Sequence, residues 1–232
     1  SLVVSPVLWI VMTMFLVLNG ISFNILLSVL NDPMAPEGAT MRWFFTTIFH
    51  WLAVLPIAPI LTMGSVASEY RNGTVETLMT APVNEVEIIV SKFLACWAFY
   101  ALLWVPTLAY VLYLSQVSEP DYGPIFSGYL GTLLLGGAFM AIGVFCSSVT
   151  KSQVVAAVLS FVVVVSLFLI SFVEMFSEWA GNPLLTHVSL YSQMDAWASG
   201  KIDTRYIVFD LSWIALGLFG SIRVLESRRW RA

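Results

Sequence analysis

Residues 154–173, VVAAVLSFVVVVSLFLISFV, decide the class of fold, because this stretch holds no charged residue. A helix that crosses the hydrocarbon core of a bilayer needs about 20 mostly apolar residues. A charge at the centre of such a helix costs about 2.5 to 3.5 kcal/mol on insertion scales. The stretch therefore predicts a transmembrane helix, and the composition of the 232-residue chain, 59% hydrophobic and 10% charged, points to a membrane protein as a whole.

Further apolar windows predict the other spans, and they lie at residues 7–30, 43–64, 86–115, 125–149 and 206–225. The last window is the weakest, because Asp210 and Arg223 could only be accommodated near the membrane interfaces. Pro56 and Pro59 in the second window predict a kink. We expect an all-α membrane protein with six transmembrane helices in a single domain over residues 1–232.

The distribution of Lys and Arg predicts the orientation of these spans, since cytoplasmic segments carry an excess of both. With both termini in the cytoplasm, the inside residues are Arg71, Lys92, Lys151, Arg223, Arg228, Arg229 and Arg231, against Arg42, Lys201 and Arg205 outside. This excess favours cytoplasmic termini. The outer loops are then residues 31–42, 116–124 and 174–205.

The outer loop 174–205 is long for a connection, and it carries large amphipathic side chains among polar residues. They are Trp179, Tyr191, Met194 and Trp197. Such residues favour the depth where the bilayer meets water. We expect short helices lying at the outer interface, and we expect His50, in an aromatic stretch at the outer end of the second span, to be an interfacial group as well.

Several function classes are disfavoured by the sequence. The ten basic residues are too scattered to follow a nucleic-acid backbone. Cys96 and Cys146 stand alone in apolar stretches, which argues against a disulfide framework or a zinc site. The chain carries neither a G-x-x-x-x-G-K-[ST] phosphate-binding motif nor the H-E-x-x-H or G-x-S-x-G motifs of hydrolytic enzymes.

The segment between the second and third spans, residues 66–84, reads VASEYRNGTVETLMTAPVN. Val66 and Tyr70 would share one helical face, Asn72 and Gly73 would end that helix, and Thr74 would cap a second short one. Asn84 followed by Glu87 predicts the start of the third span. On the residues alone, the segment is either a solvated link between two spans or a docking element on the inner surface.

The pattern E-x-R-x-G-T-x-E-x-L-x-x-x-P-V in this segment, followed by Lys92, resembles the permeases of type-2 ABC exporters. Residues 199–205, SGKIDTR, and the basic tail at 228–231 are similar to the gliding-motility-associated subgroup. The resemblance covers nearly the whole chain. It departs at the N-terminus, where the amphipathic helix typical of the family does not appear, and we expect residues to be missing before Ser1.

The resemblance implies a permease that has no catalytic residues and binds no cofactor, because ATP and Mg would be bound by a separate ATP-binding subunit. Two such subunits and a second permease, identical or related, would complete the transporter in a bacterial inner membrane. The coupling residues that contact the ATP-binding subunit would be Glu69, Tyr70, Arg71, Gly73, Thr74, Glu76, Leu78 and Pro82.

Polar residues in the first two spans have two possible roles, lining a translocation path or bonding between helices: Asn19, Ser22, Asn24, Thr46 and Thr47. The glycine-rich fourth span favours tight packing within the subunit over a dimer contact. Two alternatives to export stay open. One is an ATP-driven mechanical scaffold that acts on envelope partners, and the other is a secondary transporter, although the spans hold few of the ionisable residues that ion coupling needs.

Overall fold

The computed structural model describes residues 6–31, 41–73, 84–117, 120–176 and 187–229, and these ranges are helical with short connections and no strand. Within them, six helices are long and apolar enough to cross a membrane. These spans are Trp9–Leu30, Ile48–Asn72, Glu85–Val117, Tyr122–Val149, Gln153–Val173 and Thr204–Ser227. The predicted fold class, an all-α protein with six candidate spans, is confirmed.

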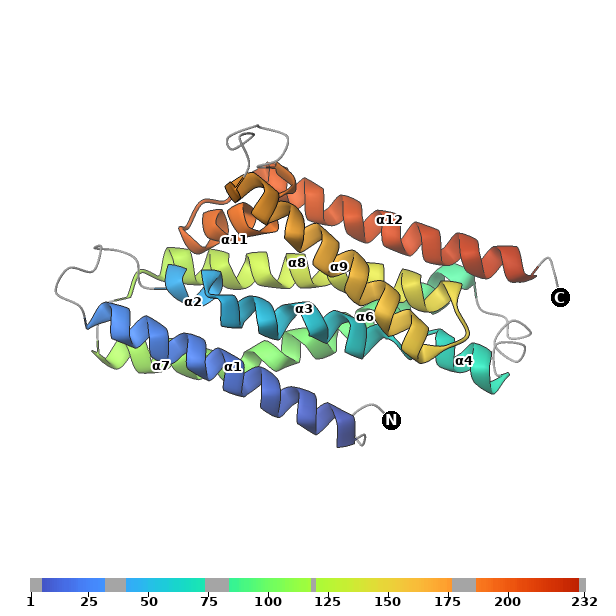
Figure 1. The fold of residues 1–232 in the computed structure, drawn as a ribbon, viewed down its shortest axis with the longest axis horizontal. Coiled ribbons are helices and arrows are strands. Elements are labelled where there is room, and N and C mark those ends of the chain that lie inside the picture. The colour runs from blue at the N-terminus through green and yellow to red at the C-terminus, as the bar shows by residue number, and fades with distance from the viewer. Residues whose placement is uncertain (1–5, 32–40, 74–83, 118–119, 177–186, 230–232) are drawn as a thin grey trace. The chain divides into compact units, whose positions relative to one another are not determined.

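The helices, labelled in Figure 1, fall into two compact units. The first unit lies within residues 1–54, 100–133 and 168–204, and the second within 55–99, 134–167 and 205–232. The helices α3 (Ile48–Thr62), α6 (Glu85–Trp104), α8 (Tyr122–Val149) and α9 (Gln153–Phe176) contribute residues to both units.

In the first unit, the short helix α2 (Arg42–Thr46) packs against α1 (Pro6–Leu30) and α11 (Leu190–Ala198). Arg42 of α2 and Asp195 of α11 form a two-pronged ion pair, with Nε to Oδ1 at 2.6 Å and Nη2 to Oδ2 at 2.8 Å. The hydrogen bond to Asp195 raises the pKa of Arg42 above its ordinary value, so the guanidinium stays charged. The pair joins two elements that lie far apart in the sequence.

The second predicted span is interrupted near its start. Thr47, with ψ of 147°, separates α2 from α3, and the hydroxyls of Thr46 and Thr47 donate to the carbonyls of Arg42 and Trp43. These bonds give the Arg42 and Trp43 carbonyls side-chain partners from the two residues beside the break. Pro56 and Pro59 lie inside α3, whose helical assignment runs through both, and the kink predicted at them stays a prediction.

The third span has a break that the sequence analysis missed. Helix α6 ends at Trp104, a 3-10 turn follows over Val105–Thr107, and α7 continues over Leu108–Val117. Pro106 lacks the N–H that a continuous helix would use. The Thr107 hydroxyl donates to the Trp104 carbonyl at 2.6 Å, so this carbonyl has a hydrogen-bond partner at the interruption.

The outer loop 174–205 contains a short helix, α11, and the interfacial position expected for its large residues stays a prediction. Met194 and Trp197 are fully buried, and Ser127 and Thr132 of α8 bond to them, with Ser127 Oγ 2.6 Å from the Trp197 carbonyl. Tyr191, on another face, is 41% exposed. Trp179 lies outside the described residues. Sequence composition did not show that α11 packs on α8.

His50 is also enclosed, because the residue is 0% exposed, and its expected interfacial depth stays a prediction. It lies among the aromatic side chains of Phe44, Phe45, Trp51 and Trp104, with ring centroids 5.5 to 6.4 Å away. The aromatic stretch that suggested an interface thus forms the interior of the first unit.

The glycines of α8 receive side chains from neighbouring helices of the same subunit. A Cβ at Gly128 would overlap with Phe45, and one at Gly131 would overlap with Trp197. In the second unit, a Cβ at Gly143 would overlap with Thr62 of α3. These contacts support the predicted packing within the subunit, since small residues let helices approach closely in a membrane.

The second unit is built around Val66, Ile88, Ile89, Val144 and Leu225, with Tyr70, Leu218 and Ile222 packed against them. Helix α12 (Thr204–Arg229) approaches α8 closely at Gly217, where a Cβ would lie 2.8 Å from the Ala141 carbonyl oxygen. Asp210 of α12, expected near a membrane interface, is fully buried within the protein.

Replacing Gly143 with alanine tests this packing. The added methyl group meets Thr62 on a neighbouring helix, and overpacking of this kind costs about 1 to 3 kcal/mol, equivalent to roughly 5 °C in unfolding temperature. Thermal unfolding of the full chain in detergent measures the effect. Gly20→Ala is the matched control, because its Cβ would have only an ordinary contact at 3.6 Å with the Tyr110 hydroxyl. An equal unfolding temperature for both variants would contradict the packing described here.

Candidate functional site

The candidate site is the short helix α4 (Ala67–Asn72), which forms the end of the second candidate span and precedes α6. Its C-cap is Gly73 with φ of 71°, and the Gly73 N–H donates to the Glu69 carbonyl. A residue with a Cβ rarely adopts this left-handed conformation, which explains why glycine stands there. The helix end predicted at Asn72 and Gly73 is confirmed.

The start of α4 is held by Ser147 of α8. The Ser147 hydroxyl accepts hydrogen bonds from the N–H groups of Val66 and Ala67, each at 3.1 Å, and donates to the Met63 carbonyl at 3.1 Å. It thus satisfies N–H groups that have no partner within the first turn of a helix. The sequence analysis missed Ser147, because a serine inside an apolar span has no local feature that marks it as the cap of another helix.

Glu69 of α4 forms an ion pair with Lys92 of α6, and the Lys92 ammonium also donates to the Ser65 carbonyl. The side chains are only 25% and 18% exposed. A pair with this little exposure is screened less than one at the surface. The ion pair with Lys92 inside the chain therefore competes with the expected contact between Glu69 and a charge on a partner subunit. The docking role of Glu69 stays a prediction.

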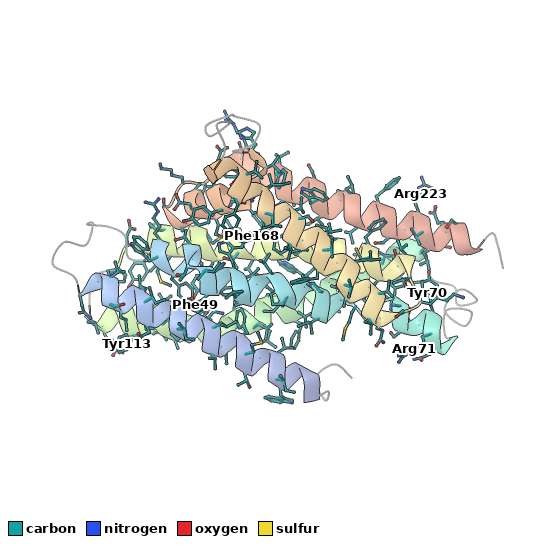
Figure 2. All side chains as sticks on the ribbon, in the orientation of Figure 1. Phe49, Tyr70, Arg71, Tyr113, Phe168 and Arg223 are labelled. Carbon is teal, nitrogen blue, oxygen red and sulfur yellow. The ribbon has the colours of Figure 1, made fainter. Side chains whose placement is uncertain are left out.

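The two labelled residues of α4 in Figure 2, Tyr70 and Arg71, have different surroundings. Tyr70 packs with Val66 against the apolar cluster of the second unit, so the shared face predicted for these two residues is confirmed. Arg71 is exposed, as are Asn72 and Gly73. Helix α4 thus packs on the spans through Val66 and Tyr70, and its C-terminal end at Arg71–Gly73 is exposed among the described residues.

The rest of the predicted coupling segment cannot be placed. Thr74, Glu76, Leu78 and Pro82 lie outside the described residues. Beyond them, α6 begins at Glu85, and the Asn84 N–H donates to the Glu87 carboxylate at 3.4 Å, which is one half of the expected capping arrangement.

The five residues proposed for a translocation path do not share one environment. Asn19 and Ser22 are fully buried and donate to carbonyls of their own helix, at 2.9 Å to Phe15 and 3.2 Å to Leu18. Asn24 is exposed, and Thr46 and Thr47 bond to the backbone of α2. A path through these residues stays a prediction. No group of three or more His, Cys, Asp or Glu that could hold a metal occurs within the described ranges.

Comparison with known families decides the class of protein. The model of the family described as "ABC-2 family transporter protein" matches residues 36–190, which include all of α4 and its supports Lys92 and Ser147. The chain belongs to the ABC-2 family of transporter proteins. No curated protein matches the sequence.

Membership of the ABC-2 family establishes a membrane permease component that is not a nucleotide-binding domain. The family also implies association with an ABC ATP-binding subunit. Together with the six candidate spans, it establishes a multi-pass membrane protein. The resemblance to type-2 ABC permeases is thus confirmed at the level of the family.

Substitution of Ser147 by alanine should loosen the start of α4. The N–H groups of Val66 and Ala67 lose their acceptor, and a buried donor without a partner costs about 1 to 3 kcal/mol, so α4 amide exchange should accelerate roughly tenfold. Hydrogen–deuterium exchange of the full chain in detergent measures this. The control is Ser148→Ala, because Ser148 is equally buried but donates to the Phe145 carbonyl of its own helix. Equal exchange in both variants would refute the capping role of Ser147.

Substitution of Lys92 by methionine should free α4 from α6, because it removes the charge that Glu69 and the Ser65 carbonyl contact. We expect exchange at residues 67–72 to rise roughly fivefold, in keeping with the loss of a charge-assisted hydrogen bond. The double variant Glu69→Lys/Lys92→Glu restores the ion pair but not the bond to Ser65, and it should recover part of the protection. No recovery in the double variant would show that the ion pair itself does not hold α4.

Proposed function

We propose that this chain is the membrane-spanning subunit of an ATP-driven exporter, in which residues 66–84 form the contact with the ATP-binding subunit. The observation that carries the proposal is the attachment of α4 to the spans within a chain of the ABC-2 family. Ser147, Lys92 and the cluster around Val66 fix α4 to α8 and α6. A push on the exposed face of α4 would therefore move these helices as a body.

The exposed end of α4 supplies the first part of the proposed contact. Arg71 carries an exposed charge that would pair with a carboxylate on the partner and define the register of docking. One exposed pair adds little affinity. We expect Thr74, Glu76, Leu78 and Pro82 to supply the remaining surface, as the sequence resemblance implies.

The proposed working unit has two permeases and two ATP-binding subunits, with ATP and Mg bound in the latter and no cofactor in this chain. The excess of Lys and Arg on one side of the spans supports cytoplasmic termini. A bacterial inner membrane is what the sequence resemblance implies. The proposals of export and of a place in the gliding-motility-associated subgroup rest on the sequence resemblance of residues 66–84, 199–205 and 228–231. Polar residues such as Asn24 and Thr46 remain candidates for the path.

A mechanical scaffold is the alternative function, and one observation favours it. Helix α11, within the segment 174–205, is joined to α2 by Arg42 and Asp195 and to α8 by Ser127. A motion of these helices would thus be passed to the segment, where an envelope partner would receive it. Membership of the ABC-2 family supports an ATP-driven protein, whether exporter or scaffold, and argues against a secondary transporter.

The direct test is purification of the full-length protein from its native membrane in mild detergent, with identification of co-purifying chains by mass spectrometry. We expect a stoichiometric ATP-binding subunit and vanadate-sensitive ATP hydrolysis. A complex that hydrolyses ATP but moves no solute in vesicles would favour the scaffold. Recovery of the chain without an ATP-binding subunit would contradict both functions.

Charge reversal at Arg71 tests the docking face. Arg71→Glu places a carboxylate on the exposed side of α4, where it would repel the proposed partner, and we expect at least roughly tenfold loss of co-purifying ATP-binding subunit. The chain should keep its unfolding temperature, because Arg71 is exposed. Lys201→Glu is the matched control, an exposed charge reversal on the predicted outer side. Equal recovery of the subunit with both variants would remove α4 from the interface.

A further inference from the structure

The first unit contains a groove of about 160 Å³ that the proposed function does not use. Trp51 and Phe168, whose ring centroids lie 4.7 Å apart, are almost fully buried and form its base. Ile48 and Phe172 are 52% and 40% exposed at its edge. The complete lining is Thr46, Ile48, Trp51, Phe168, Ser171, Phe172 and Tyr191.

The groove lies where two membrane spans end. Ile48 is the first residue of the second span, and Phe172 lies next to Val173, the last residue of the fifth. The ends of spans lie where acyl chains meet the phospholipid headgroups. The groove is thus placed to meet the upper part of a lipid chain in one leaflet.

The ion pair of Arg42 with Asp195 stands next to this groove. Arg42 precedes Thr46 by one helical turn on α2, and Asp195 follows Tyr191 by one turn on α11, so the ion pair lies just beyond two lining residues. The Arg42 side chain is 52% exposed. Its contact with Asp195 uses Nε and Nη2, which leaves the Nη1 N–H groups directed away from that carboxylate.

We propose that this groove binds one acyl chain of a membrane phospholipid and that Arg42 binds its phosphate. Lipid chains are the apolar molecules available to a groove that faces a bilayer, and aromatic side chains such as Trp51 and Phe168 match them chemically. The guanidinium selects a lipid with a phosphate, since it donates several hydrogen bonds to one anion. This binding site is independent of ATP and of a partner subunit.

A photoreactive lipid tests the acyl-chain site. The full-length protein is reconstituted in phosphatidylcholine vesicles that contain a small fraction of phosphatidylglycerol with a diazirine on one acyl chain, and labelling of the peptide with Tyr191 is measured. Ile48→Trp fills the mouth of the groove and should reduce labelling on the order of tenfold, because lost methylene contacts weaken binding several-fold each. Leu169→Trp is the matched control, since Leu169 is also 52% exposed but does not line the groove.

The headgroup is tested by competition with a diacylglycerol that carries the same photoreactive chain but no phosphate. The wild-type protein should prefer phosphatidylglycerol, Arg42→Gln should lose this preference, and Lys201→Gln should keep it. Equal labelling in Ile48→Trp and Leu169→Trp, or an unchanged preference in Arg42→Gln, overturns the proposal. Should Ile48→Trp fail to fold, the Arg42 comparison decides alone. Vanadate-sensitive ATPase activity is measured in parallel, so a failure of lipid binding is distinguished from a failure of the proposed function.

Discussion

A backbone group inside a bilayer has no water to bond with, so each break in a helix needs a hydrogen-bond partner from the protein itself. The breaks in this chain have such partners. Thr46 and Thr47 bond to carbonyls of α2, and Thr107 bonds to Trp104 beside Pro106. Ser147 bonds to the N–H groups at the start of α4. These hydroxyl groups give backbone groups beside the interruptions a hydrogen-bond partner within the protein.

The interruption before α4 bears most directly on the proposed function. A helix that simply continued from the second span would move along with that span alone. Because α4 starts anew at Ala67, it contacts α8 through Ser147 and α6 through the ion pair of Glu69 with Lys92. A force on one short helix can thus reach several spans, which is what an ATP-driven permease requires.

Close approach of helices is the second constraint on the structure. Lipid offers no hydrophobic gain for bringing helices together, so helix association depends instead on side chains that pack against small residues. Phe45 and Trp197 lie against Gly128 and Gly131, and Thr62 lies against Gly143. In the first unit, this packing also encloses His50 and positions α11, whose ion pair with α2 borders the lipid groove.

The sequence by itself determined the number of candidate spans, the end of α4 at Asn72 and Gly73, and the family, because apolar length, helix-ending residues and local motifs are properties of neighbouring residues. Only the tertiary structure decided the partners of Glu69, Ser147 and Arg42 and the burial of His50 and Trp197. It also decided where the helices break, at Thr47 and Pro106, and which hydrogen bonds form beside those breaks. Arg42 and Asp195 show the physical reason, since 153 positions separate them in the sequence. Hydropathy is a property of consecutive residues, whereas a hydrogen bond between helices depends on which helices the fold brings into contact.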